Sequence, residues 1–183
     1  MLRGVNVGGH NRVKMDTLRV LYKSLKLQDA QTYVQSGNVI FRTGEMDSSA
    51  LGKKIQQAIH RKCDIECEVI LRTAPEMREA IANNPFAGRS GIEPDKLLVT
   101  FLAAVPSPEA REKLLALKLD PEELHLIGRE LYIYFPNGAG KSKLPWASLE
   151  KKLKFPPRTS RNLNSVTKMI EIAETMEDAS SKN

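Results

Sequence analysis

Hydrophobic positions in the first half of the chain switch between helical and strand spacing. Apolar residues at i, i+4, i+7 and i+8 predict a helix from Leu51 to about Ile59, with Asp47 or Ser48 as its N-cap. A similar pattern predicts an earlier helix that begins near Met15. Short extended patterns predict four strands, at residues 2–5, 30–35, 39–41 and 66–71. The resulting order is β-α-β-β-α-β, which is the order of the ferredoxin-like plait.

The second half of the chain repeats this order of elements. The capping box Thr73–Glu76 predicts a connecting helix before the repeat begins. The repeat is predicted as a strand at 97–102, a helix from Ser107, strands at 124–127 and 131–135, a helix around Trp146 and a strand at 158–161. A final helix, capped by Asn164, is expected to fray from Glu177 onward.

These patterns predict an α+β fold of two tandem ferredoxin-like plaits, with a connector helix and a C-terminal helix in addition. Each plait is expected to hold an antiparallel sheet in the strand order 4-1-3-2, with two helices on one face. Residues 1–72 form the predicted first half, and residues 73–183 form the second half together with both additional helices.

The predicted topology brings polar loops together at one end of each sheet. In the first half, the glycine-containing loop 6–11 follows strand one, and the hairpin turn 36–38 follows strand two, which runs in the same direction. In the second half, the segment 138–143 and the segment 161–164 leave neighbouring strands at a common end. Lys141, Lys143 and Arg161 are therefore expected to converge.

A basic stretch runs from residue 136 to residue 169. It holds eight Lys and Arg side chains and a single acid, Glu150, in a chain whose formal net charge is +6. Lys151, Lys152 and Lys154 flank apolar helix positions, so a solvated helix face and contact with phosphates are two alternative interpretations. The charge permits an anionic partner without identifying one.

The sequence Gly138-Ala139-Gly140-Lys141-Ser142 ends like a phosphate-binding P-loop. The P-loop pattern requires a further glycine five residues before Gly140, where this chain has Phe135, and no following strand ends in an Asp that could hold Mg²⁺. A nucleotide hydrolase is therefore not predicted. An anion nest formed by the backbone amides and a plain strand-to-helix turn remain as alternatives.

No metal site and no cofactor can be identified from the residues. The two cysteines, Cys63 and Cys67, have C-x₃-C spacing, and no second pair of Cys or His lies where a zinc site would need it. His10, in the glycine loop, is a candidate ligand or general base, although no carboxylate pattern beside it indicates a triad.

The chain shows no segment that would place it in or across a membrane. No run of 18 apolar residues occurs, and the N-terminus lacks the pattern of a signal peptide. With only two cysteines, this composition predicts a cytoplasmic protein that makes no contact with a membrane.

Four motifs, spread in order over nearly the whole chain, resemble those of a bacterial family of unknown function, filed as domain of unknown function sixteen-ninety-seven. They are Leu2-Arg3-Gly4-x-Asn6-Val7-Gly8-Gly9, Tyr33-x-Gln35-Ser36-Gly37-Asn38-Val39-x-Phe41, Gly138-Ala139-Gly140-x-Ser142-Lys143-Leu144 and Thr159-x-Arg161-Asn162-x-x-x-Val166.

The resemblance implies two α/β plait halves and no established activity, cofactor or catalytic residue. One departure concerns the first strand, because family members have several more apolar residues before the Leu-Arg-Gly run, where this chain has only Met1. A shortened first strand is therefore expected to affect the first sheet.

Three functions from different classes are compatible with the sequence. The first is a binding module for a phosphate-bearing ligand, nucleic acid included, although the aromatic run that stacks bases in RRM domains is absent. The second is an enzyme acting on a small phosphorylated or acyl substrate, with His10, Lys141, Ser142 and Arg161 as candidate groups. The third is a structural or oligomeric protein that uses exposed sheet edges. The candidate ligand-binding residues are Arg3, Asn6, Gly8, Gly9, His10, Ser36, Asn38, Gly138, Gly140, Lys141, Ser142, Lys143, Arg161 and Asn162.

Overall fold

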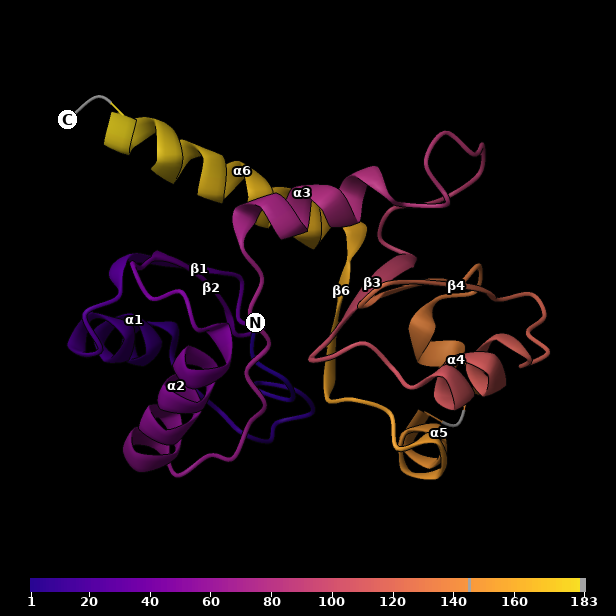
Figure 1. The fold of residues 1–183 in the computed structure, drawn as a ribbon, viewed down its shortest axis with the longest axis horizontal. Helices are drawn as coiled ribbons and strands as arrows, with labels where there is room; N and C mark the ends of the chain where they lie inside the picture. The colour runs from indigo at the N-terminus through magenta and orange to yellow at the C-terminus, as the bar shows by residue number, and fades with distance from the viewer. Residues whose placement is uncertain (145, 182–183) are drawn as a thin grey trace. The chain divides into compact units, whose positions relative to one another are not determined.

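The computed structural model describes residues 1–144 and 146–181, which fall into two compact units (Figure 1). Unit 1 comprises Met1–Ala74 together with the chain from Lys168 onward, and unit 2 comprises Pro75–Thr167.

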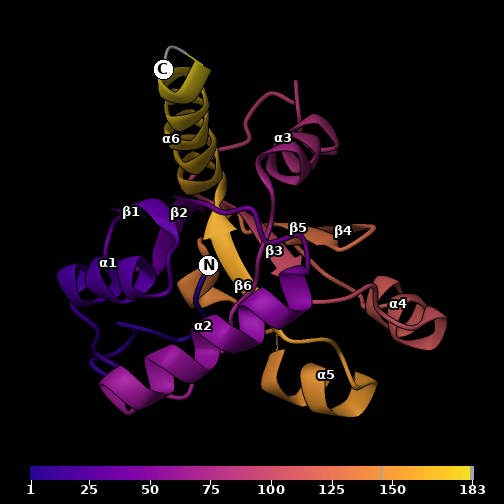
Figure 2. The same cartoon turned by 60° about the vertical axis from the view of Figure 1, so that its left-hand side comes forward.

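Unit 2 is built around an antiparallel sheet of four strands (Figure 2). The strands are β3 (Leu97–Leu102), β4 (Glu123–Ile127), β5 (Glu130–Tyr134) and β6 (Arg158–Asn162). They lie in the order β4-β5-β3-β6, which is the order predicted for this half. The central strand β3 pairs antiparallel with β5 on one side and with β6 on the other.

Two helices cover one face of this sheet, as expected. They are α4 (Pro108–Leu115) and α5 (Trp146–Leu153). The core beneath them is mainly aliphatic and contains Leu102, Leu114, Leu126, Leu131, Ile133 and Phe135. Helix α4 begins where the sequence predicts, because the Ser107 hydroxyl accepts a hydrogen bond from the Ala110 amide at 3.1 Å.

The opposite face of the sheet in unit 2 is covered by α3 (Ala74–Ala82) and the loop that follows it. Tyr132 donates its hydroxyl to the Ala80 carbonyl at 2.6 Å, and Tyr134 donates to the Gly91 carbonyl at 3.0 Å. Both tyrosines belong to β5, where alternate side chains face the same side of the sheet. The connector helix therefore serves as the third layer of unit 2.

Unit 1 packs two helices against a shorter sheet. Its elements are α1 (Met15–Ser24), β1 (Gln28–Tyr33), β2 (Asn38–Arg42), α2 (Ser48–Cys63) and the greater part of α6 (Leu163–Ser181). Leu18, Ile55 and Ile59 are fully buried in its core, as the helical spacing predicts. The α2 N-cap is Asp47, whose carboxylate accepts from the amides of Ser49 and Ala50.

The strands predicted at residues 2–5 and 66–71 do not form. Among the residues that the structure describes, unit 1 has a two-stranded sheet, β1-β2, and the two expected strands are joined only by an isolated antiparallel bridge between Leu2 and Val69. The Leu2 amide donates to the Gly37 carbonyl at 3.0 Å, and the Arg3 amide donates to the Glu68 carbonyl at 2.9 Å. Gly4, at a φ of +69°, then turns the chain away, so the extended run ends after three residues.

The last helix differs from its prediction at both ends. It begins at Leu163, and its N-terminal cap is Asn162 instead of Asn164, because the Asn162 side-chain oxygen accepts from the Ser165 amide at 2.9 Å. It also continues to Ser181, whereas fraying was expected from Glu177. Burial of Met176, the residue directly before the expected start of fraying, stabilises the last turns.

No helix in the described ranges has both the length and the apolar character required to cross a bilayer.

We expect Gly37→Ala to destabilise the protein more than Gly4→Ala. Both glycines have a φ near +70°, so an added side chain causes similar backbone strain of about 1–2 kcal/mol at either position. At Gly37 the new Cβ would lie 2.5 Å from a Val5 methyl and 2.8 Å from the Leu2 Cβ, while at Gly4 it meets nothing within 4 Å. Overpacking should therefore add about 1–3 kcal/mol at Gly37 alone. Urea unfolding of both variants measures the difference, and equal losses would contradict the packing seen here.

Candidate functional site

The glycine loop of unit 1 forms a small hairpin. Val7 and His10 make an isolated antiparallel bridge, and the His10 amide donates to the Val7 carbonyl at 3.0 Å. The two residues between them, Gly8 and Gly9, both have positive φ, at +58° and +81°. A two-residue hairpin turn of this hand requires positive φ at both central positions. The paired glycines are thus explained by the turn itself.

Asn6 fastens this hairpin to the turn that follows β1. Its side-chain nitrogen donates to the carbonyls of Val13 and Gln35, each at 2.9 Å, and its side-chain oxygen accepts from the Val13 amide at 2.8 Å. The predicted proximity of loop 6–11 to the 36–38 turn is confirmed by the bond to Gln35. The bonds also show that both polar atoms of Asn6 are occupied by the protein's own backbone.

The other polar candidates of unit 1 divide into buried and exposed groups. Asn38 is fully buried and donates to the Ser36 hydroxyl at 2.9 Å, so this pair supports the turn from within. His10 is exposed at the rim of the hairpin. Arg3 is half-buried, and its backbone amide joins the bridge to the 66–71 segment. Of these four residues, His10 is the one most accessible to a ligand.

The segment Gly138–Ser142 of unit 2 is a strand-to-helix turn. Gly138 has a φ of +85°, and Ala139–Lys141 form a single short 3₁₀ turn instead of the long helix that follows a P-loop. The Gly138 amide donates to the Phe135 carbonyl at 2.8 Å, and the Ser142 hydroxyl accepts from the Leu144 amide at 3.1 Å. Gly140 and the side chains of Lys141 and Lys143 are exposed.

The register of the sheet places this turn and the end of β6 at the same end of unit 2. Tyr134, the last residue of β5, pairs with Leu97, and Asn162, the last residue of β6, pairs with Leu98. The two segments leave the sheet on either side of β3. The predicted common end is confirmed by this register.

The side chain of Arg161 is half-buried, and its guanidinium bonds neighbouring groups of β6. Its guanidinium donates to the Thr159 hydroxyl at 2.8 Å and to the Ser160 carbonyl at 2.7 Å. Burial lowers the pKa of this guanidinium to about 10, because a charge removed from water is disfavoured. The guanidinium of Arg161 is therefore bonded to the protein itself, although its place near the end of β6 puts it at the same end of the sheet as the turn that carries Lys141 and Lys143.

Two more cations of the basic stretch are neutralised by carboxylates. Arg158 lies 2.7 Å from the Glu150 carboxylate, in a pair whose side chains are both largely buried, and its guanidinium lies 4.6 Å from the centre of the Trp146 ring. Lys168 forms an ion pair of 2.8 Å with Glu171, which lies just beyond the stretch. The sequence shows the Lys168 pair as an i, i+3 spacing, while the Arg158 pair depends on tertiary packing.

Five lysines of the stretch remain exposed, and no carboxylate in the described part of the chain pairs with them. They are Lys141, Lys143, Lys151, Lys152 and Lys154. The single acid in residues 141–154 is Glu150, which is already paired with Arg158. This segment, hereafter the lysine segment, therefore carries a concentrated positive charge, which Glu109 of α4 offsets in part through its electrostatic attraction to Lys154.

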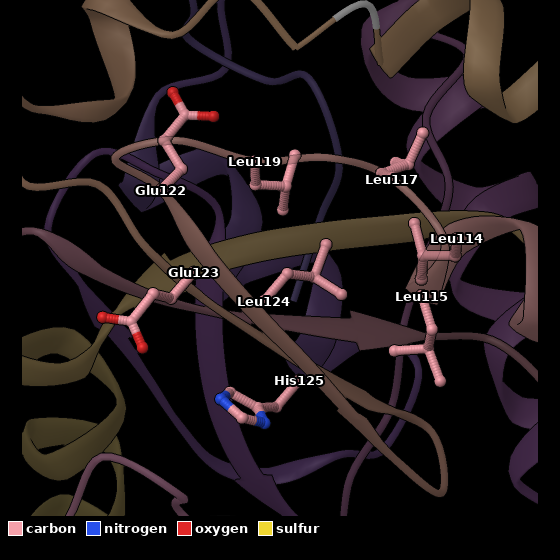
Figure 3. A pocket seen from close by; sticks show the side chains of 8 residues that line it. All are labelled: Leu114, Leu115, Leu117, Leu119, Glu122, Glu123, Leu124 and His125. Carbon is pink, nitrogen blue, oxygen red and sulfur yellow. The ribbon is translucent and has the colours of Figure 1, made fainter.

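Two hollows of the described surface contain none of the candidate residues. One, of about 220 Å³, lies between the end of α4 and the start of β4 and is lined by five leucines with Glu122, Glu123 and His125 (Figure 3). The other, of about 820 Å³, lies in unit 1 between α1 and β1 and is lined in part by Arg19, Lys23 and Lys26. No group of three or more His, Cys, Asp and Glu side chains in the described ranges could hold a metal ion.

We expect Asn6→Asp to destabilise the protein by about 2 kcal/mol, because two hydrogen bonds donated by the amide nitrogen are lost at about 1 kcal/mol each. Asn11→Asp is a matched control, since Asn11 also has positive φ but donates a single exposed bond to the Gly4 carbonyl. Urea unfolding should show a clearly smaller loss for the control. A loss of stability at Asn6 no larger than that at Asn11 would show that the bonds of Asn6 to Val13 and Gln35 are not formed in solution.

Comparison with known proteins connects this fold to a bacterial relative of similar size. The chain is similar to a solved structure titled "The structure of conserved bacterial protein SP0830 from Streptococcus pneumoniae", with 21% sequence identity and a TM-score of 0.66. The similarity covers 95% of this chain and 96% of that one, and at this identity it shows the fold alone. No curated protein matches the chain. A family model matches residues 1–132, which is well over half of the chain. The protein therefore belongs to the family described as "Protein of unknown function (DUF1697)".

Proposed function

We propose that the protein is a binding module for a phosphate-bearing ligand, nucleic acid included, and that the lysine segment makes the contact. The observation that carries this proposal is the set of five exposed lysines within residues 141–154, whose single acid is occupied by Arg158. Like charges gathered in one segment repel one another, and an anion that lies across them relieves this repulsion.

The glycine loops support the proposal less directly. Asn6, Ser36, Asn38, Ser142 and Asn162 each use a side-chain atom to bind the protein itself. Their role in a ligand site would be to hold the turns in shape. His10 is exposed and Arg3 is half-buried, and they stay candidate contacts for a phosphate-bearing ligand, as do Gly8 and Gly9 through their backbone amides.

The enzyme alternative lacks a specific observation in its favour. A serine nucleophile needs a base within hydrogen-bond reach. In the described part of the chain, the Ser142 hydroxyl accepts from the Leu144 amide, and no His, Asp or Glu bonds it. The oligomeric alternative is weakened at β4, one of the two edge strands of the sheet in unit 2, because Arg111 from α4 donates to the Leu126 carbonyl at 3.1 Å and covers part of that edge.

For the fold, we infer that both units are ferredoxin-like plaits, and that strands one and four of the first plait are reduced to the Leu2–Val69 bridge. The support is the order of segments in unit 1. The N-terminal segment bonds Gly37 of the β1–β2 hairpin on one side, and it bonds Glu68 on the other side. We also propose a cytoplasmic location, which the two free cysteines, Cys63 and Cys67, suit.

Salt dependence of nucleic-acid binding tests the proposed contact. Each neutralised phosphate contributes a slope of about −0.9 to a plot of log K against log salt for duplex DNA. The double variant Lys151→Ala/Lys152→Ala should therefore reduce the magnitude of the slope by about 1.8, and Lys141→Ala/Lys143→Ala should do the same. Fluorescence anisotropy with a labelled duplex, titrated from about 50 mM salt upward, measures both.

The matched control is Lys53→Ala/Lys54→Ala, which removes an equally exposed adjacent lysine pair from helix α2 of unit 1. This variant changes the net charge by the same amount but should leave the slope as in the unaltered protein. An equal decrease of the slope in the control would show that binding follows net charge. The lysine segment would then be excluded as the specific contact.

A further inference from the structure

None of the aromatic side chains of this protein is fully exposed to solvent. The chain has five Phe, four Tyr and one Trp, and every one of these ten residues lies in the described ranges. Six are buried, namely Tyr22, Phe86, Phe101, Tyr132, Tyr134 and Phe135. Four are half-buried, namely Tyr33, Phe41, Trp146 and Phe155. Proteins that bind single strands without sequence preference stack bases on exposed aromatic rings, and this surface offers none that is fully exposed.

The two aromatic residues nearest the lysine segment are already engaged. The guanidinium of Arg158 covers the Trp146 ring at 4.6 Å, and Trp146 also packs against the aliphatic core under α5. Phe155 packs against the same core. A base could stack on either ring only after displacing Arg158 or opening the core.

The arginines of the basic stretch are engaged as well. Arg158 is paired with Glu150, and Arg161 is bonded to Thr159 and Ser160. A guanidinium can read guanine through two parallel hydrogen bonds, whereas a lysine ammonium acts as a point charge. The cations left for a ligand in residues 141–154 are all lysines.

We infer that the lysine segment binds the phosphate backbone of duplex nucleic acid without reading or stacking its bases. This inference rests on the proposed function and adds the class of ligand to it. Contact is made by ammonium groups alone, so affinity follows the density of phosphates. Phosphates lie closer together along a duplex than along a flexible single strand, so the duplex is preferred, and its sequence has no effect.

The test compares three labelled DNAs at one low salt concentration, with the unaltered full-length protein. Two are 20-base-pair duplexes of unrelated sequence, and the third is a single-stranded oligothymidine of the same length. We expect the two duplexes to bind within about twofold of each other and the single strand to bind more weakly. Emission of Trp146, the single Trp, should stay unchanged when the oligothymidine is added, because no base reaches its ring.

Each of three results would overturn the inference and leave the proposed function intact. One is tighter binding of the oligothymidine by about tenfold or more, which stacking of bases would produce. Another is strong quenching of Trp146 by the oligothymidine. A preference of about tenfold or more between the two duplexes would also overturn it, since base readout would then be present. If none of the three DNAs binds, nucleic acid is excluded as the ligand, and this inference falls with it.

Discussion

Burial of β3 on both faces is the constraint on which unit 2 depends. Five of its six residues are buried, and its backbone is paired on both sides, with β5 and with β6. A strand with no exposed face tolerates little change of register, because a slip by one residue exchanges the side chains that meet the α4–α5 layer and the α3 layer. The fixed register brings the ends of β5 and β6 together. The lysine segment therefore begins at a defined place in the fold, although it is itself a surface turn and helix.

In unit 1, the polar residues that look most functional in the sequence serve the backbone. The chain turns through positive φ at Asn6, Gly8, Gly9 and Gly37, and such turns leave amides and carbonyls without partners in a regular ladder. The side chain of Asn6 supplies three of the missing bonds. Leu2 and Val5 pack so closely against Gly37 that a Cβ atom at position 37 would clash with both. These motif residues are thus accounted for by folding, and a ligand is not needed to explain them.

The local sequence pattern was sufficient to predict most of the fold, but it was insufficient to predict most of the candidate site. Helices α1, α2 and α4 and strand β3 follow from spacing and capping residues that lie within a few positions of one another. The failed strands at 2–5 and 66–71 depend on hydrogen bonds between residues more than sixty positions apart. The partial burial of Arg161 could not be predicted either, because β6 has no apolar alternation and the half-buried state of most of its side chains results from its place in the sheet.

The basic stretch shows how far formal charge can differ from the charge that a partner meets. Of its eight cations, one is half-buried and bonded to neighbouring groups and two are paired with carboxylates, and all three lie outside the lysine segment. The five that remain are lysines on mobile stems with strongly hydrated ends. Such groups retain much of their side-chain entropy and hydration when they contact phosphates. Binding through them is therefore expected to be fast, sensitive to salt and insensitive to sequence. Tighter or sequence-selective binding would require arginine and aromatic side chains, which in this part of the chain are engaged with the protein itself.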